Sequence, residues 1–172
     1  VGGLFPKRGI KELVIALNKT NATLFLAGKF SDKKFEEEVK RIDGWEQVKF
    51  LGYLDRQGII EVLQKAQIGM VTLHPTQSYQ ESLPIKLFEY MIAKLPVISS
   101  DFEFWKPLVE GNHCGIMVDP LDTDAIAEKI NFLLSKPDLL EKFGENGYQA
   151  VISKYSWDSQ AEKLLELYKS IS

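Results

Sequence analysis

Two glutamates, Glu81 and Glu89, lie eight residues apart on either side of Pro84. A proline near the first helical turn predicts that a helix begins between Ser82 and Pro84, which leaves Glu81 on the preceding loop. The unpaired N–H groups and the dipole at such a helix start form an anion site, and a diphosphate would suit it. A partly desolvated carboxylate needs donors, which a hydroxyl pair of a ligand can supply. The stretch therefore predicts a site for a ligand with phosphate and hydroxyl groups.

The helix that follows Pro84 has a predicted apolar arc and a predicted polar arc. The apolar arc consists of Ile85, Leu87, Phe88, Met91 and Ile92, and the polar arc of Lys86, Tyr90 and Lys94. Glu89 falls on the border between them, where its carboxylate is partly desolvated. Alternatively, Glu89 pairs with Lys86 on the helix surface, a contact worth a few tenths of a kcal/mol. Spacing alone favours neither interpretation.

Short apolar runs alternate with longer segments of helical period, which is typical of an α/β protein with a parallel sheet. The predicted strands are Val1–Leu4, Thr23–Ala27, Val48–Leu51, Ile68–Leu73, Pro96–Ser99 and Gly115–Val118. The predicted helices are Gly9–Asn18, Asp32–Ile42, Arg56–Ala66, Pro84–Lys94, Thr123–Leu134, Asp138–Ser153 and Trp157–Ser170, with a short turn at Phe104–Val109. Trp45, Trp105 and Trp157 are expected to anchor these elements, Trp157 by stapling the last helix. We therefore expect a Rossmann-like, doubly wound, mainly parallel six-stranded sheet with helices on both faces.

The carboxyl ends of all strands in such a sheet meet at one edge, where ligands bind. Lys7 and Arg8 follow the first predicted strand, Tyr53 the third and His74 the fourth. The loop after the fourth strand has about ten residues, and a loop of this length is more often functional than idle. For His74, capping of the turn before Pro75 is favoured over a role in a pocket.

The 172 residues are 45% apolar and 26% charged, which is typical of one globular domain, and we expect a single domain over residues 1–172. The net charge is −3 with both signs mixed along the chain, which argues against nucleic acids and membrane surfaces as partners. Cys114, with His74 and His113, provides neither a disulfide framework nor a zinc spacing, so a reducing cytoplasm fits best. No apolar run approaches the roughly 18–20 residues that span a bilayer. Val1 falls inside a predicted strand, so we expect a piece of a longer protein.

The stretch ESLPIKLFEYMIAKLPVIS, residues 81–99, resembles the signature of the retaining glycosyltransferases of family 4, which have the GT-B fold. Two glutamates with seven residues between them, a helix and a strand beginning Pro96-Val97-Ile98 match in order and spacing. The segments VGGLFPKRGI, TLFLAG, VKFLGYL, GIMVDPLD and YSW also match in order, so the resemblance covers nearly the whole chain. The chain resembles the C-terminal, donor-binding half of such an enzyme.

The resemblance implies a role for each matching residue. Glu89 would bind the ribose hydroxyls of a nucleotide diphosphate sugar, linked to UDP or GDP. Glu81 would lie beside the sugar ring, near the reacting carbon, as the catalytic carboxylate. Backbone amides around Ser82 and Leu83 would meet the diphosphate, whereas Pro84 has no N–H to donate.

One position departs from the family pattern. The family's arginine in the first turn reads Gly3 here, and Arg8 takes the place of the family's lysine. Arg8 can still bind a phosphate bidentately, and Lys7 and Lys86 are candidates for the missing second charge. Tyr53 lies where the family brings the chain against the nucleotide base.

The resemblance also implies partners and a pathway. The full chain would add an N-terminal acceptor-binding domain, and transfer would need no metal. Polysaccharide or lipopolysaccharide assembly is the expected pathway, and a peripheral membrane contact of the full enzyme stays open. Two alternatives stay open as well: half of a nucleotide-sugar epimerase, or a non-catalytic module that binds an anion or a protein.

Overall fold

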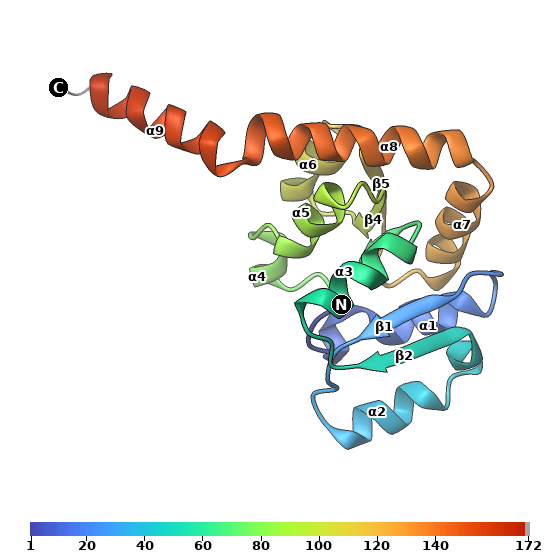
Figure 1. Ribbon diagram of the computed structural model, residues 1–172. Coiled ribbons are helices and arrows are strands. Elements are labelled where there is room, and N and C mark those ends of the chain that lie inside the picture. The colour runs from blue at the N-terminus through green and yellow to red at the C-terminus, as the bar shows by residue number, and fades with distance from the viewer. Residues whose placement is uncertain (171–172) are drawn as a thin grey trace.

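The computed structural model describes residues 1–170, apart from several side chains of the last helix. Its strands form two parallel sheets (Figure 1). One sheet pairs β1 (Leu24–Ala27) with β2 (Val48–Gly52), and the other holds β3 (Gly69–Val71), β4 (Val97–Ser100) and β5 (Gly115–Val118) in that order. Each pair is aligned from the first residues of its strands. The α/β class with parallel strands is therefore confirmed.

Helices connect the strands and cover the sheets. Their bounds are α1 (Ile10–Leu17), α2 (Lys33–Lys40), α3 (Arg56–Lys65), α4 (Gln77–Gln80), α5 (Ile85–Ile92), α6 (Lys106–Val109), α7 (Thr123–Leu134), α8 (Pro137–Ala150) and α9 (Trp157–Ser170). Turns of 3₁₀ helix cover Pro6–Arg8, Asp43–Gln47 and Glu103–Trp105, and a π-helical turn covers Val151–Tyr155. Asp32, Asp55 and Asp122 start α2, α3 and α7 by accepting a hydrogen bond from a backbone N–H of the first turn. Such caps satisfy N–H groups that the helix itself leaves unpaired.

The prediction of six strands in one sheet is wrong at the amino end of the chain. The segment Val1–Leu4 forms one isolated parallel bridge, between Leu4 and Phe30, instead of a strand. It runs alongside residues that follow β1, because the Gly2 N–H donates to Ala27 O at 2.9 Å. The segment thus starts where β1 ends, and the described residues form five strands in two sheets.

Alternate residues of the sheet formed by β3, β4 and β5 face opposite sides. Val97 and Met117 pack with side chains of α5 and α8. Ile98 and Val118 pack with side chains of α1 and α7. Because successive side chains of a strand point to opposite faces, helices cover both faces of this sheet. The doubly wound, Rossmann-like arrangement is therefore confirmed.

The helix α5 buries a different face from the one predicted. Tyr90 is 7% exposed, whereas Ile85 is 74% and Ile92 is 47% exposed. A Cβ on Gly69 would lie 2.4 Å from the Tyr90 ring, so this glycine of β3 makes room for the ring. Burial, with a smaller effect of Glu89, raises the pKa of the Tyr90 hydroxyl to about 12. The periodicity of α5 does not predict that Tyr90 is buried, because the space for its ring is provided by Gly69 on β3.

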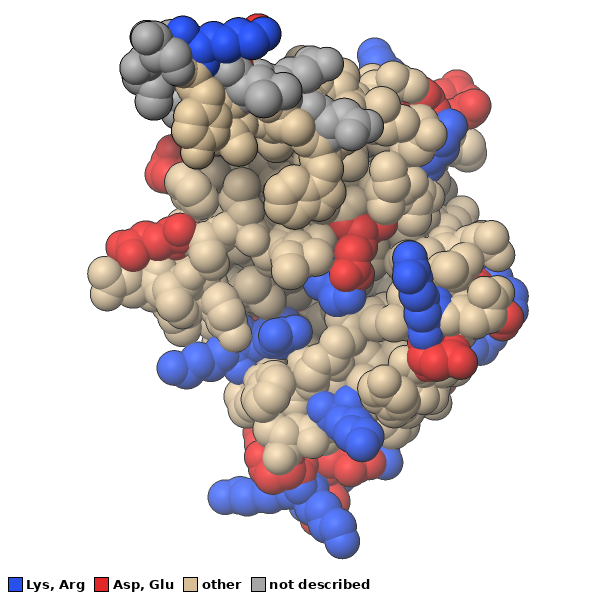
Figure 2. Space-filling model, turned by 60° about the vertical axis from the view of Figure 1, so that its left-hand side comes forward, with Lys and Arg blue, Asp and Glu red and all other residues tan. Residues whose placement is uncertain are grey.

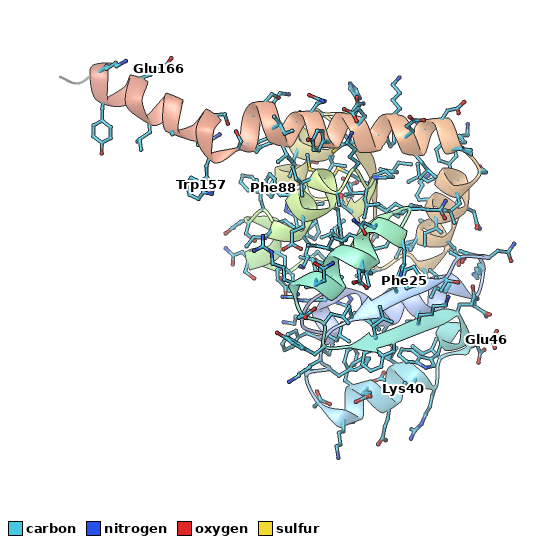
Figure 3. The ribbon with its side chains drawn as sticks, in the orientation of Figure 1. Phe25, Lys40, Glu46, Phe88, Trp157 and Glu166 are labelled. Atoms are coloured by element: carbon cyan, nitrogen blue, oxygen red, sulfur yellow. The ribbon has the colours of Figure 1, made fainter. Side chains whose placement is uncertain are left out.

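Two tryptophans have opposite environments. Trp105 is fully buried, which confirms it as an anchor. Trp157 is 90% exposed and lies clear of the packed body in Figure 3, so the prediction that it staples the last helix is wrong. The reason is that α9 projects away from the body in Figure 1 and offers Trp157 no surface to pack on.

The surface has no strong charge bias on the face shown in Figure 2, where acidic and basic side chains are interspersed with uncharged ones. Over the described part of the chain, no helix combines the length and the apolar character needed to cross a membrane.

Candidate functional site

Three glycines bring the amino-terminal segment and the ends of β1 and β2 together. The Gly28 N–H donates to Gly52 O at 2.7 Å. A Cβ on Gly28 would lie 1.7 Å from Gly2 O, so two backbones touch where a side chain would not fit. Both Gly28, with φ of 143°, and Gly52, with φ of 63°, also have backbone conformations that favour glycine. Bare backbone therefore forms this part of the carboxyl edge of the sheet.

We expect Gly28→Ala to destabilise the chain by several kcal/mol more than Gly52→Ala. Both substitutions force an L side chain into a positive φ, at a cost of roughly 1–2 kcal/mol. Only at Gly28 does the new Cβ also meet a carbonyl oxygen, because nothing lies within 4 Å of a Cβ on Gly52. Urea unfolding followed by circular dichroism measures both changes. Equal losses of stability would contradict the close approach of Gly2 to Gly28.

Arg8 and Lys86 lie against the backbone of the amino-terminal segment. A Cβ on Gly2 would lie 3.2 Å from Arg8 Nη1 and 3.7 Å from Lys86 Cε. Burial lowers the pKa of the Val1 amino group to about 6, with Lys86 and Arg8 lowering it further and Glu89 raising it. These electrostatic effects require all three side chains to lie near Val1. The structure therefore brings together three of the predicted donor-binding residues, Arg8, Lys86 and Glu89.

The guanidinium group of Arg8 has an unused donor. Its Nε is buried and has no hydrogen-bond partner among the described residues. Its Cζ lies 5.6 Å from the centre of the Phe5 ring, a cation–π contact. A buried donor without a partner costs about 1–3 kcal/mol, more when it is charged. An anion bound next to Arg8 would remove this cost.

The amino end of α5 supplies further donors. The helix begins at Ile85 with Pro84 as its N-cap, within about a residue of the predicted start. The N–H groups of Ile85 and Lys86 have no acceptor inside α5, as in the first turn of any α-helix. Ser82 and Leu83 are exposed, but Ser82 is held in place by two bonds. Its hydroxyl donates to Ser78 O at 2.7 Å, and its carbonyl oxygen accepts from Trp105 Nε1 at 2.6 Å.

Glu89 and Lys86 form an ion pair on adjacent turns of α5. The Glu89 side chain is 39% exposed and that of Lys86 is 27% exposed, so the pair lies at a rim. This confirms the contact expected for a surface pair. The pair also lies beside Arg8 and Val1, which distinguishes it from an isolated surface contact.

Glu81 lies in a separate hollow. It is exposed, caps the end of α4 and accepts a hydrogen bond from Gln77 Nε2 at 3.1 Å. The hollow is lined by Gln77, Gln80, Glu81, Asp101, Phe102, Glu103 and Phe104. Arg8 and Lys86 line a different cavity. Glu89 lines neither of these two hollows, so neither of them contains both glutamates.

Tyr53, Lys7 and Gly3 complete the predicted set. Tyr53 is 74% exposed, and Lys29 Nζ lies 5.5 Å from the centre of its ring. The Lys7 side chain is exposed, while its carbonyl oxygen accepts from the His74 N–H at 2.9 Å. A Cβ on Gly3 would lie 2.4 Å from the Phe5 ring, so Phe5 fills the space of a side chain at position 3.

Sequence reasoning missed one contact at this edge. His74 Nε2 lies 3.0 Å from Glu12 Oε2, and both side chains are largely buried. The favoured role of His74, capping the turn before Pro75, is therefore wrong for its side chain. Glu12 lies far away in the sequence, on α1, and carries no local signal of this pairing.

The chain matches proteins that transfer sugars. The sequence model of the family described as "Glycosyl transferases group 1" matches residues 1–150. The lipopolysaccharide glucosyltransferase WaaG of Escherichia coli is 25% identical over an aligned length of 174 residues. The alignment covers 96% of this chain and 45% of WaaG. The chain spans less than half the length of curated relatives that it matches, 43% of one and 44% of another.

Solved structures agree with this match at the level of the fold. The C-terminal domain of the glycosyl transferase group 1 protein LpcC from Francisella tularensis has a TM-score of 0.77 at 24% identity, covering 91% of this chain and 84% of that domain. Anabaena Alr3699/HepE in complex with UDP has a TM-score of 0.81 at 20% identity, covering 98% of this chain and 48% of HepE. Because the family model spans most of its length, the chain belongs to the glycosyl transferases group 1 family.

Proposed function

We propose that residues 1–172 form the single donor-binding domain of a retaining glycosyltransferase with the GT-B fold. The observation that carries the proposal is the buried, unpartnered Nε of Arg8 beside Lys86. A diphosphate supplies oxygens to this donor and faces the free N–H groups of Ile85 and Lys86. The phosphate site is thus built from cations on two elements and from one helix end.

The remaining parts of the donor extend from this phosphate site. Glu89 accepts hydrogen bonds from the ribose hydroxyls, because a carboxylate at a half-exposed rim is an acceptor only. Tyr53 offers an exposed aromatic face to the nucleotide base. Lys7 adds positive charge near the phosphates, and Gly3, with Phe5 over it, leaves the family's arginine position empty. Glu81, in its own hollow, faces the sugar.

The transfer reaction places negative charge on the leaving diphosphate and positive charge on the reacting sugar carbon. Arg8, Lys86 and the amino end of α5 stabilise the first charge as it develops. The Glu81 carboxylate stabilises the second, as carboxylates do at glycosidic centres. The sequence Asp122–Asp124 has an Asp-x-Asp pattern, but Asp122 caps α7 and Asp124 pairs with Lys19. We therefore assign the neutralisation of the diphosphate to these cations and not to that aspartate pair.

UDP is the donor nucleotide that we propose to test first, because HepE was solved with UDP and has the same fold. The acceptor belongs to a second domain in the full protein, so the isolated chain should bind donor without transferring sugar. By analogy with WaaG, the product is a polysaccharide or a lipopolysaccharide. A cytoplasmic, reducing location is part of the proposal, since Cys114 is buried as a free thiol.

Titration of the chain with UDP tests the proposal. We expect a Kd on the order of mM, about −4 kcal/mol, because half of the cleft is missing. Amide NMR resonances should shift near Gly3, Tyr53 and Glu89 but not near the remote Gly144. Titrations with GDP and ADP compare the affinities for the three nucleotide bases, and titration with pyrophosphate measures how much of the affinity comes from the phosphates. If UDP shifts none of these resonances, or binds no better than pyrophosphate, the chain is at most an anion-binding module.

A further inference from the structure

His74 contacts the chain on both sides of Arg8. Before Arg8, the carbonyl oxygen of Lys7 accepts a hydrogen bond from the His74 backbone N–H at 2.9 Å. After Arg8, Glu12 on the first turn of α1 places its Oε2 atom 3.0 Å from His74 Nε2. A single residue of the loop that follows β3 therefore holds the segment that carries Arg8 at two points.

The contact between Glu12 and His74 is closed to water. The two side chains are 17% and 24% exposed, and the atoms that meet, Oε2 and Nε2, are both buried. Neither atom has a hydrogen bond to any other described group. Buried polar atoms need a partner, and an imidazole nitrogen that carries a proton can donate to a carboxylate oxygen. Moving α1 away from the loop after β3 would therefore leave two buried polar atoms unpaired, which is costly.

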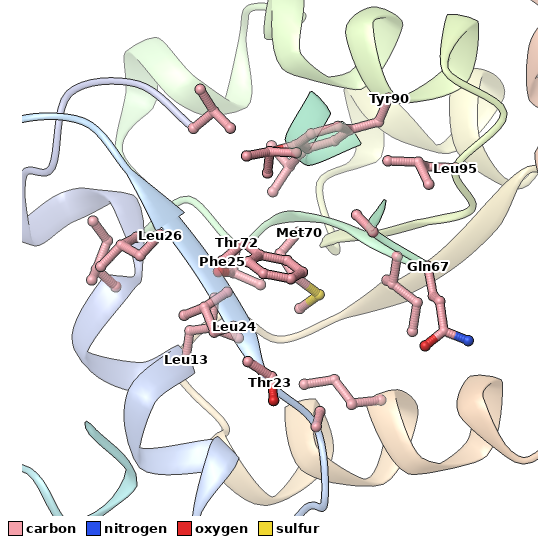
Figure 4. A pocket seen from close by; sticks show the side chains of 18 of the residues that line it. Leu13, Thr23, Leu24, Phe25, Leu26, Gln67, Met70, Thr72, Tyr90 and Leu95 are labelled. Atoms are coloured by element: carbon pink, nitrogen blue, oxygen red, sulfur yellow. The ribbon is translucent and has the colours of Figure 1, made fainter. Parts of the chain in front are cut away.

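The backbone between these two points packs directly against the end of β3. A Cβ on Gly9 would lie 1.9 Å from Thr72 O, so no side chain fits at position 9. The φ of Gly9, 69°, is also a conformation that favours glycine. Leu13 of α1 and Thr72 both line the cavity shown in Figure 4, and Arg8 lines the same cavity. The segment that carries Arg8 thus lies against residues 72–74 at three successive points.

We propose that Glu12 and His74 form a positioning pair, which holds the turn Pro6–Arg8 so that the Arg8 guanidinium group faces the phosphate site. Glu12 and His74 do not line the cavity that Arg8 and Lys86 line, so we assign them no direct contact with the diphosphate. A binding group is effective when the residues around it hold it in place before the ligand arrives. The effect of the pair on phosphate binding rests on the proposed function, but the position of Arg8 can be measured without a ligand.

The test compares variants of the ¹⁵N-labelled chain. His74→Leu removes the contact with Glu12 and keeps the backbone N–H that donates to Lys7 O. Glu12→Ala breaks the same contact from the other side and serves if His74→Leu does not fold, because alanine is well tolerated in a helix. His74→Gln is the conservative variant, since its side-chain amide can still donate to the Glu12 carboxylate.

Ser100→Ala is the matched control. The Ser100 hydroxyl is buried and donates to Leu73 O at 2.7 Å, directly before His74 in the chain. The substitution removes a buried contact at the same end of β3 but leaves the contact between Glu12 and His74 in place. An effect that comes only from lower stability would therefore appear in this control as well.

NMR gives two readouts, the exchange of the Arg8 Nε–H proton with water in the absence of ligand and the Kd for pyrophosphate. The Arg8 Nε is buried, so its proton should exchange slowly in the wild-type chain. We expect His74→Leu and Glu12→Ala to speed this exchange by about tenfold or more, because the turn opens locally. Both should weaken pyrophosphate binding about threefold or more, because Arg8 is no longer held in place. His74→Gln and Ser100→Ala should stay within about twofold of the wild type in both readouts.

Equal exchange of the Arg8 proton in the wild type and in both pair variants would overturn the proposal. Equal acceleration in Ser100→Ala, or no recovery in His74→Gln, would also overturn it, because packing at this end of β3 would then position Arg8. Faster exchange with unchanged pyrophosphate binding would remove the pair from phosphate binding. If the wild type binds neither UDP nor pyrophosphate, the proposed function fails, while the exchange of the Arg8 proton still decides whether the pair positions Arg8.

Discussion

Replacing Glu89 with alanine should weaken UDP binding at least tenfold. A hydrogen bond to a charged group is worth roughly 1.5–3 kcal/mol, and about 1.4 kcal/mol corresponds to a factor of ten in Kd. The ribose hydroxyls would lose their acceptor, while Arg8 and the amino end of α5 would keep the phosphates. NMR titration of the wild-type chain and the variant with UDP measures the ratio of the two Kd values.

Two controls separate the ribose contact from the loss of charge. Glu145→Ala removes a glutamate that also pairs with a lysine, Lys94 at 2.7 Å, and is 46% exposed, but lies on α8. It should leave UDP binding unchanged. Pyrophosphate has no ribose, so Glu89→Ala should not weaken its binding and should strengthen it if the released Lys86 turns to the phosphates. An equal Kd for UDP in the wild type and Glu89→Ala would leave Glu89 as a surface partner of Lys86.

Local sequence was enough to predict the elements whose packing follows their own periodicity. Val97 and Ile98 lie in an apolar run next to Pro96, and the strand β4 formed there is buried on both faces. The helices predicted at Arg56–Ala66 and Thr123–Leu134 are α3 and α7, and Asp55 and Asp122 cap their starts. The buried face of α5 could not be predicted in this way, because the space that holds the Tyr90 ring exists only where Gly69 of β3 has no side chain.

The first predicted strand failed for a related reason. Val1–Leu4 has the composition of a strand, but a strand exists only where a neighbour lies beside it. Here β1 ends at Ala27, and Gly2 already pairs at that end. The sequence of Val1–Leu4 is compatible with a strand, but it does not show where the neighbouring strand β1 ends.

The candidate site was predictable where topology decides it and unpredictable where side chains meet over long distances. Arg8 and Lys86 come together because both follow the carboxyl edge of the sheet. The contact of His74 with Glu12 joins β3 to α1 and has no local signal. Glu81 lies just before α5 as predicted, but the short helix α4 in that loop, from which Gln77 Nε2 donates to Glu81, was not predicted.

Trp105→Ala should destabilise the chain by about 3–5 kcal/mol, the cost of removing a large aromatic side chain from a core. Trp105 is fully buried, and its ring lies 4.7 Å from that of Phe102, centre to centre. Its Nε1 also donates to Ser82 O at 2.6 Å, which fixes the loop between Glu81 and α5. Trp105→Phe keeps most of the packing and leaves Ser82 O without this donor, so about 1–3 kcal/mol should be lost. Urea unfolding followed by circular dichroism gives the free energy of unfolding of each variant.

Trp157→Ala is the matched control, because it removes the same side chain from a position that is 90% exposed. A surface substitution of this kind should change stability by no more than about 0.5 kcal/mol. The loop provides a second readout, since Trp105→Phe should speed amide exchange at Leu83 while the exchange at Ile98, in the core of the sheet, changes only with global stability. Trp105 acts as an anchor of the loop only if Leu83 responds more than Ile98. If the two amides respond equally, Trp105 contributes to the core alone, and the position of Glu81 depends on α4 and its Gln77 contact instead.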